Sequence, residues 1–124
     1  MPRRRDRRAA ELHGRRAERL AALWLRCKFY RIIGMRVRNA FGELDLVALA
    51  PGGILCFIEV KARGEFEGAA ESLTNRKRER ILRAAELYLA SHAALRHKAV
   101  RFDAILMAPN RLPRHIRDAW RLGF

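Results

Sequence analysis

Cysteine is rare in this chain, and its two copies, Cys27 and Cys56, stand far apart with no CxxC pair. A structural zinc site needs about four closely spaced ligands, so we expect none here. The four histidines form no HExxH or other metal-ligand pattern. A Walker loop, a GxGxxG loop and a GxSxG nucleophile elbow are also absent. These absences remove the usual signatures of zinc enzymes, nucleotide-loop enzymes and serine hydrolases.

Long hydrophobic runs are missing as well, and no stretch reaches the roughly 18 apolar residues that indicate a membrane-spanning helix. The basic start MPRRRDRR is not followed by the apolar segment that a secretory signal carries. We therefore expect a cytoplasmic protein with no membrane partner.

Acidic residues are strongly outnumbered, with 13 Asp and Glu against 27 Lys and Arg, for a formal net charge of +14. Such a surplus is informative about partners rather than about fold, and nucleic acid is the polyanion it favours. By length the chain is one domain. We expect residues 1–8 to be a disordered basic arm, for which phosphate contact is the functional interpretation, and residues 9–124 to be a single folded domain.

The stretch from Gly42 to Arg63 has the pattern of two strands joined by a turn at Pro51–Gly53. Because strand side chains alternate between faces, such a hairpin places Asp45 opposite Glu59 on one face. Like charges directly opposed destabilise a sheet. A divalent cation would explain the pair, since Mg²⁺ is typically held by about one or two carboxylates plus substrate phosphates.

An ordinary charged hairpin is the alternative interpretation of the same residues. In that case Glu43–Lys61 and Asp45–Arg63 are cross-strand ion pairs on a solvated face. Two features favour the metal site. The acidic residues gather at one end of an otherwise apolar ribbon, and the surrounding chain is strongly basic.

Asp45, followed after the turn by Glu59-Val60-Lys61, resembles the D-x(n)-E-x-K signature of the PD-(D/E)xK nuclease superfamily. The words GELDLVA, FIEVKAR and RFDA resemble the YraN-like family of small bacterial proteins, regarded as related to archaeal Holliday-junction resolvases. The resemblance covers nearly the whole chain. It implies an α/β fold of restriction-endonuclease-like type, with one mixed central sheet and helices packed on it. It also implies Mg²⁺ or Mn²⁺ held by Asp45, Glu59 and the carbonyl of Val60, with Glu18 from the first helix completing the cluster.

The function implied by this resemblance is metal-dependent cleavage of phosphodiester bonds, with branched DNA as a candidate substrate and DNA favoured over RNA. Asp45, Glu59 and Lys61 would be the catalytic residues. Lys61 would orient or help to deprotonate the attacking water, or pair with charge on the reacting phosphate. Two identical chains could present two sites to a junction. The alternative is a protein that binds nucleic acid without sequence specificity and does not cleave it.

Other charged residues have a structural and a functional interpretation side by side. Glu18 is either a surface residue paired with neighbouring arginines or the third acidic ligand. Four basic residues are either solvated or bind the phosphates that flank the cleaved bond: Arg36, Arg38, Arg63 and Lys77.

The apolar periodicities predict the order α-β-β-β-α-β with a short tail, and leave the strand order open. The first helix is expected to bury Ala17, Leu20, Ala21 and Trp24. The expected elements are a helix from Arg7 to Leu25, a strand from Phe29 to Arg38, the hairpin, a helix from Thr74 or Asn75 to Ser91, a strand from Val100 to Met107, and an end segment from His115 to Phe124.

Overall fold

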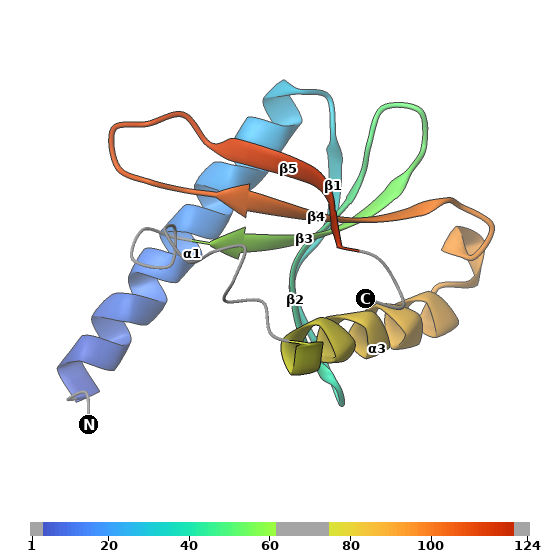
Figure 1. The fold of residues 1–124 in the computed structure, drawn as a ribbon, viewed down its shortest axis with the longest axis horizontal. Coiled ribbons are helices and arrows are strands. Elements are labelled where there is room, and N and C mark those ends of the chain that lie inside the picture. Colours follow the sequence, from blue (N-terminus) through green and yellow to red (C-terminus); the bar gives the residue numbers. More distant parts are fainter. Residues whose placement is uncertain (1–3, 62–74, 121–124) are drawn as a thin grey trace.

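The computed structural model describes residues 4–61 and 75–120, which form a five-stranded sheet in the order β1-β2-β3-β4-β5 (Figure 1). Helix α1 and helix α3 pack on this sheet. The expected α/β fold is confirmed, and it is consistent with a restriction-endonuclease-like sandwich. The elements are α1 (Arg4–Cys27), β1 (Arg31–Asn39), β2 (Gly42–Leu49), β3 (Leu55–Lys61), α3 (Asn75–Ser91), the 3-10 turn η1 (Ala93–Leu95), β4 (Val100–Leu106) and β5 (Arg114–Trp120).

The sheet is mixed, as expected. Strands β1, β2 and β3 form an antiparallel meander, β3 and β4 are parallel, and β5 is antiparallel to β4. A parallel pair needs a crossover connection, and α3 lies in the chain between β3 and β4. Residues 114–120 form a fifth strand, whereas the sequence predicts for 115–124 only a short end segment that packs back on the domain.

Alternate residues of β3 enter two separate hydrophobic cores. Leu55 and Phe57 pack with α3, whereas Cys56 and Ile58 pack with α1. The strand is thus buried on both faces, with one helix on each. No helix in the described part of the chain is long and apolar enough to cross a membrane.

Helix α1 is rotated relative to the expected buried stripe. Its buried side is formed by Ala17, Ala21, Ala22 and Leu25, whereas Leu20 is 50% exposed. Small alanine side chains let a helix lie close to a sheet. The alanine side of α1 therefore faces the sheet, and the larger Leu20 points away from it. The helix also begins at Arg4, so that residues 4–8, expected in a disordered arm, form its first turns.

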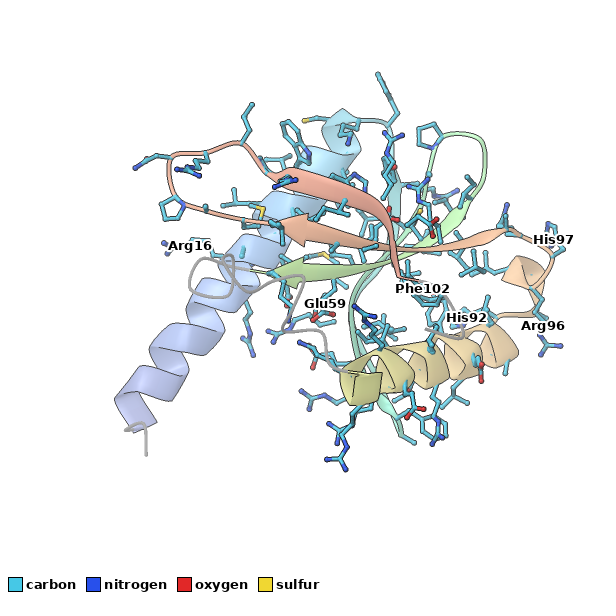
Figure 2. The ribbon with its side chains drawn as sticks, viewed as in Figure 1. Arg16, Glu59, His92, Arg96, His97 and Phe102 are labelled. Atoms are coloured by element: carbon cyan, nitrogen blue, oxygen red, sulfur yellow. The ribbon has the colours of Figure 1, made fainter. Side chains whose placement is uncertain are left out.

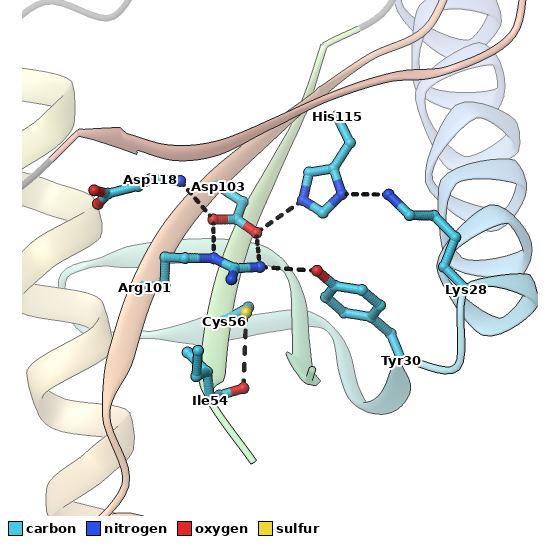
Figure 3. Close-up of polar contacts among 8 residues, drawn as sticks. All are labelled: Lys28, Tyr30, Ile54, Cys56, Arg101, Asp103, His115 and Asp118. Atoms are coloured by element: carbon cyan, nitrogen blue, oxygen red, sulfur yellow. Dashed lines mark hydrogen bonds and ion pairs between the residues drawn. The ribbon is translucent and has the colours of Figure 1, made fainter. Parts of the chain in front are cut away.

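A buried carboxylate, Asp103 on β4, holds the two C-terminal strands together (Figure 3). Arg101 donates to both of its oxygens, at 2.8 and 2.9 Å, and His115 Nε2 lies 2.8 Å from Oδ2. The backbone N–H of Asp118 donates to Oδ1 at 2.9 Å. Burial raises the pKa of Asp103, but the hydrogen bonds from His115, Arg101 and Asp118 outweigh burial and leave the pKa below its usual value.

The same network reaches the end of α1. Arg101 Nη2 donates to Tyr30 Oη at 2.8 Å, and Lys28 Nζ lies 3.1 Å from His115 Nδ1 (Figure 3). Since an ionised carboxylate only accepts and an ammonium only donates, the contacts select the His115 tautomer with its proton on Nε2. The network therefore ties α1 and β5 to β4, on the α1 side of the sheet.

Candidate metal centre

The β2–β3 hairpin brings the side chains of Asp45 and Glu59 into contact just beyond the end of the strand ladder. Its ladder pairs Leu46 with Ile58, so the two acidic residues are next in line. The turn between the strands uses Gly52 and Gly53 at φ of 94° and 90°, values that L side chains rarely adopt. Figure 2 shows Glu59 on the side of β3 that faces α3.

Beyond the Leu46–Ile58 pair, the backbone ladder ends and a side chain accepts the next hydrogen bond. The backbone N–H of Val60 donates to Asp45 Oδ2 at 2.9 Å, so a carboxylate takes the place of a backbone acceptor. The hydrocarbon side chain of Val60 packs against the α1-side core and has no ligand atom, so its backbone carbonyl is the candidate ligand.

Asp45 is in an environment that disfavours its negative charge. Burial raises its pKa, the charge of Glu59 raises it further, and the hydrogen bond from Val60 opposes the rise only in part. A side-chain hydrogen bond between Asp45 and Glu59 adds to the effect. Two carboxylates in this relationship need a shared proton or a cation between them.

Helix α1 contributes Glu18. This residue follows the buried Ala17 and is itself only 8% exposed. Oxygen atoms of Glu18, Glu43 and Asp45 all lie within 4.8 Å of one another. Burial raises the pKa of Glu18, and the nearby charge of Arg36 lowers it only in part. Within the described residues, Glu18 Oε2 is a buried oxygen with no hydrogen bond.

Glu43 pairs with arginines of β1, which are partners that the sequence analysis did not predict for it. Its cross-strand neighbour on β1 is Arg38, next to the Asn39–Gly42 pair that closes the β1–β2 hairpin. Glu43 Oε2 accepts from Arg38 Nη2 at 3.1 Å.

Arg36 joins the same pair from β1. Its Nε donates to Glu43 Oε1 at 3.2 Å and lies 3.3 Å from Glu18 Oε2. Burial raises the pKa of Glu43, but the hydrogen bonds from Arg38 and Arg36 outweigh it and lower the pKa overall. Arg36 and Arg38, expected to bind phosphate, therefore contact two members of the acidic group.

Two lysines lie on the other side of the centre, beside Glu59. Lys61 Nζ is 3.6 Å from Glu59 Oε1, and Lys77 Nζ, from the first turn of α3, is 3.4 Å from the same oxygen. Lys61 is 4% exposed, so its charge is held inside the protein. The structure thus brings Lys61 and Lys77 to the acidic residues, whereas Arg63 lies outside the described residues.

Two cavities flank the acidic residues, and basic side chains contribute to the lining of both. The larger, of about 450 Å³, lies between α1 and β1, and the smaller, of about 290 Å³, adjoins the start of α3. Glu43 lines both cavities. The larger cavity is lined by Arg15, Glu18, Arg19, Met35, Arg36, Arg38 and Glu43. The smaller is lined by Gly42, Glu43, Glu59, Arg76, Lys77, Arg80 and Ile81.

The donor set fits a hard divalent cation. Mg²⁺ and Mn²⁺ prefer carboxylate oxygen ligands. Glu18 offers a buried oxygen that makes no hydrogen bond and has Arg36 Nε 3.3 Å away, and burial and the charge of Glu59 both disfavour the ionised form of Asp45. The sequence left the role of Glu43 open, since it suits a cross-strand ion pair with Lys61 but also shares a face with Asp45 and lies in the word GELD.

Comparisons with known proteins agree on one family. The model of the family described as "Uncharacterised protein family UPF0102" matches residues 17–107. A UPF0102 protein of Caulobacter sp. (strain K31) is 49% identical over 112 residues, which is 90% of this chain and 80% of that protein.

Two further relatives match over almost their whole length. UPF0102 protein amb4503 of Paramagnetospirillum magneticum is 49% identical over 118 residues, covering 92% of this chain and 91% of the relative. UPF0102 protein Mmar10_3014 of Maricaulis maris is 48% identical over 119 residues, covering 96% and 93%. The resemblance to the YraN-like family is consistent with these matches, and the chain belongs to the UPF0102 family.

Proposed function

We propose that this protein is a nuclease that uses Mg²⁺ or Mn²⁺ to hydrolyse phosphodiester bonds, with DNA favoured over RNA as substrate. The observation that carries the proposal is the convergence of Glu18, Glu43 and Asp45 within 4.8 Å. Glu59 adjoins Asp45, and Lys61 adjoins Glu59. Arg36 and Arg38 offset part of this charge, but burial still disfavours the ionised forms of Glu18 and Asp45, and a bound cation would relieve that cost.

In this proposal Asp45 and Glu59 hold the cation, Glu18 approaches it from α1, and the backbone carbonyl of Val60 is a further candidate ligand. A bound divalent cation lowers the pKa of a water and offsets charge at a scissile phosphate. Glu43 is available to the same ion when its arginine partners are drawn away.

Lys61 is the catalytic cation of the proposal. Its burial and its 3.6 Å approach to Glu59 fix an ammonium at the edge of the acidic group. From there it can orient the attacking water or pair with negative charge that develops on the reacting phosphate.

The basic cavities would bind the phosphates on either side of the cleaved bond. Arg36 and Arg38 line the cavity beside α1, and Lys77 lines the one beside α3. Guanidinium groups pair with phosphate in two parallel hydrogen bonds, and the net charge of +14 adds a general attraction. Arg63 remains a proposed contact.

Binding without cleavage is the second candidate function, and one observation favours it. Both oxygens of Glu43 are paired with arginines, so part of the acidic group is neutralised with no metal. Such an ion-pair network would serve a protein whose basic surface only binds nucleic acid.

A cleavage assay separates the two functions. The full chain is incubated with a labelled four-way junction, a flap, a nicked duplex and single-stranded DNA and RNA, with Mg²⁺, Mn²⁺ or a chelator. We expect metal-dependent cleavage that Asp45→Asn and Lys61→Ala abolish. Glu86→Gln is the control. It removes an exposed carboxylate of α3 that lines neither cavity, and it should cleave normally. Binding of these substrates with no cleavage in either metal would favour the second function.

A further inference from the structure

Arg36 lies between two of the acidic residues that the proposed metal site needs. Its Nε is 3.3 Å from Glu18 Oε2 and 3.2 Å from Glu43 Oε1. Arg38 holds the second oxygen of Glu43 at 3.1 Å. In the protein without ligands, these arginines therefore occupy carboxylate oxygens that a cation would also require.

A cation and the Arg36 guanidinium compete for these oxygens. Both are positive, and at separations of a few ångströms in a partly buried site like charges repel strongly. A cation that binds Glu18 and Glu43 must therefore displace Arg36 or bind more weakly beside it. The side chain of Arg36 is 34% exposed and lines the open cavity, so it has space to move into.

A phosphate in the larger cavity offers Arg36 and Arg38 a replacement partner. Guanidinium groups bind phosphate at least as well as carboxylate, in the same forked geometry. Arg36 also has a left-handed backbone conformation, with φ of 51°, which is uncommon for a residue other than glycine.

We propose that the arginines exchange partners, so that nucleic-acid phosphate and divalent cation bind cooperatively. Phosphate draws Arg36 and Arg38 away from Glu18 and Glu43, and the released carboxylates then accept the cation. The inference rests on the proposed function for the identity of both ligands. It adds that the free protein holds its metal site partly closed, and that substrate opens it.

Calorimetric titration of the full chain with Mn²⁺ tests this coupling. The titration is run alone and with a saturating oligonucleotide in which phosphorothioates resist cleavage. A blank titration of the oligonucleotide subtracts the Mn²⁺ that its own phosphates bind. We expect the Mn²⁺ affinity of the protein to rise by at least about fivefold with oligonucleotide, the lower end of usual coupling between sites. Coupling is reciprocal, so Mn²⁺ must raise the oligonucleotide affinity by the same factor. This second measurement also uses the wild-type protein.

Arg36→Gln identifies the residue that couples the sites. The variant should bind Mn²⁺ more tightly than the wild type without oligonucleotide, and oligonucleotide should add less. Arg19→Gln is the matched control, because it removes the same charge from the same cavity and has no ion pair with Glu18 or Glu43 in the described structure. Its Mn²⁺ affinity should stay within about twofold of wild type.

Two negative results have different meanings. Mn²⁺ binding that is equal with and without oligonucleotide overturns the coupling and leaves the proposed nuclease intact. Equal changes in Arg36→Gln and Arg19→Gln also overturn it, because general charge then explains the effect. Absence of Mn²⁺ binding under every condition overturns the metal site itself.

Discussion

The backbone N–H of Val60 donates to Asp45 Oδ2 at 2.9 Å, at the point where the β2–β3 ladder ends. This contact fixes the Asp45 carboxylate against the neighbouring strand while Glu59 stands beside it. The acidic centre thus lies at the end of a hairpin whose strand β3 is buried on both faces. The fold keeps Asp45 beside Glu59 without a cation, so the effect of the Asp45 charge on stability should be measurable.

Asp45→Asn should stabilise the metal-free protein at neutral pH. The folded-state pKa of Asp45 lies above its unfolded value, so the folded state binds a proton more tightly. Stability therefore falls as pH rises from the unfolded pKa, near 3.9, through the folded pKa. Asparagine removes this loss and can still accept from Val60. Thermal unfolding with a chelator at pH 8 should show a higher Tm for the variant, by about 4 °C for each kcal/mol gained.

The same pair of proteins provides an internal control at low pH. Near pH 4 Asp45 is protonated in the folded state, so the difference in Tm should shrink. A variant that unfolds at the same or a lower temperature than wild type at pH 8 would show that the Asp45 charge is well accommodated.

Asp103→Asn should be destabilising in a pH-dependent way. The folded-state pKa of Asp103 lies below its unfolded value, so its contribution is present above the unfolded pKa and is lost as pH falls through the folded pKa. Removal of one partner from a buried charged network typically costs about 3–5 kcal/mol. Urea unfolding should show this loss at pH 7 and a smaller one below pH 3. An equal cost at both pH values would assign the effect to packing.

Nucleic-acid binding should weaken steeply with salt. Each phosphate neutralised on duplex DNA adds roughly 0.9 to the slope of log K against log salt. Arg38→Gln and Lys77→Gln, which line the two cavities, should each reduce the slope by roughly that amount. Arg111→Gln, in the connection between β4 and β5, is the control and should leave the slope unchanged. A flat salt response in wild type would contradict phosphate binding.

Glu43→Gln should separate stability from metal binding. The side chain is 27% exposed, and loss of a partly solvated ion pair usually costs no more than about 1 kcal/mol. Chemical denaturation should therefore change little. Mn²⁺ affinity should fall, because a carboxylate within 4.8 Å of Glu18 and Asp45 has been removed. Unchanged affinity would exclude Glu43 from the site.

The hairpin could be predicted from sequence because the residues that determine it, the turn and the two alternating strands, are close together in the chain. The Pro51–Gly53 turn and the alternation on either side set the β2–β3 register, and this register places Asp45 opposite Glu59. The arginine partners of Glu43 could not be predicted in the same way. The expected partner was Lys61 on β3, but the β2–β3 ladder ends at Leu46 and Ile58, and Glu43 instead pairs with Arg38 across the β1–β2 ladder.

The other differences also arise from tertiary packing. Strand β5 carries charges at Arg114, Arg117 and Asp118, as edge strands often do, and this weakens the apolar alternation that reveals a strand. The rotation of α1 depended on Ala22 and Leu25 packing against the sheet rather than on Leu20. That rotation is what buries Glu18, so its place in the acidic group followed from the family resemblance alone.

The central claim is that Asp45 helps to hold a divalent cation, and a calorimetric Mn²⁺ titration of wild type and Asp45→Asn tests it most directly. The substitution replaces one carboxylate oxygen by an amide nitrogen and keeps the hydrogen-bond acceptor for Val60, so both proteins should fold alike. We expect saturable Mn²⁺ binding to the wild type and its loss in Asp45→Asn, with oligonucleotide binding largely kept because the arginines remain. Equal Mn²⁺ binding by the two proteins would contradict the metal centre and leave binding without cleavage as the better account.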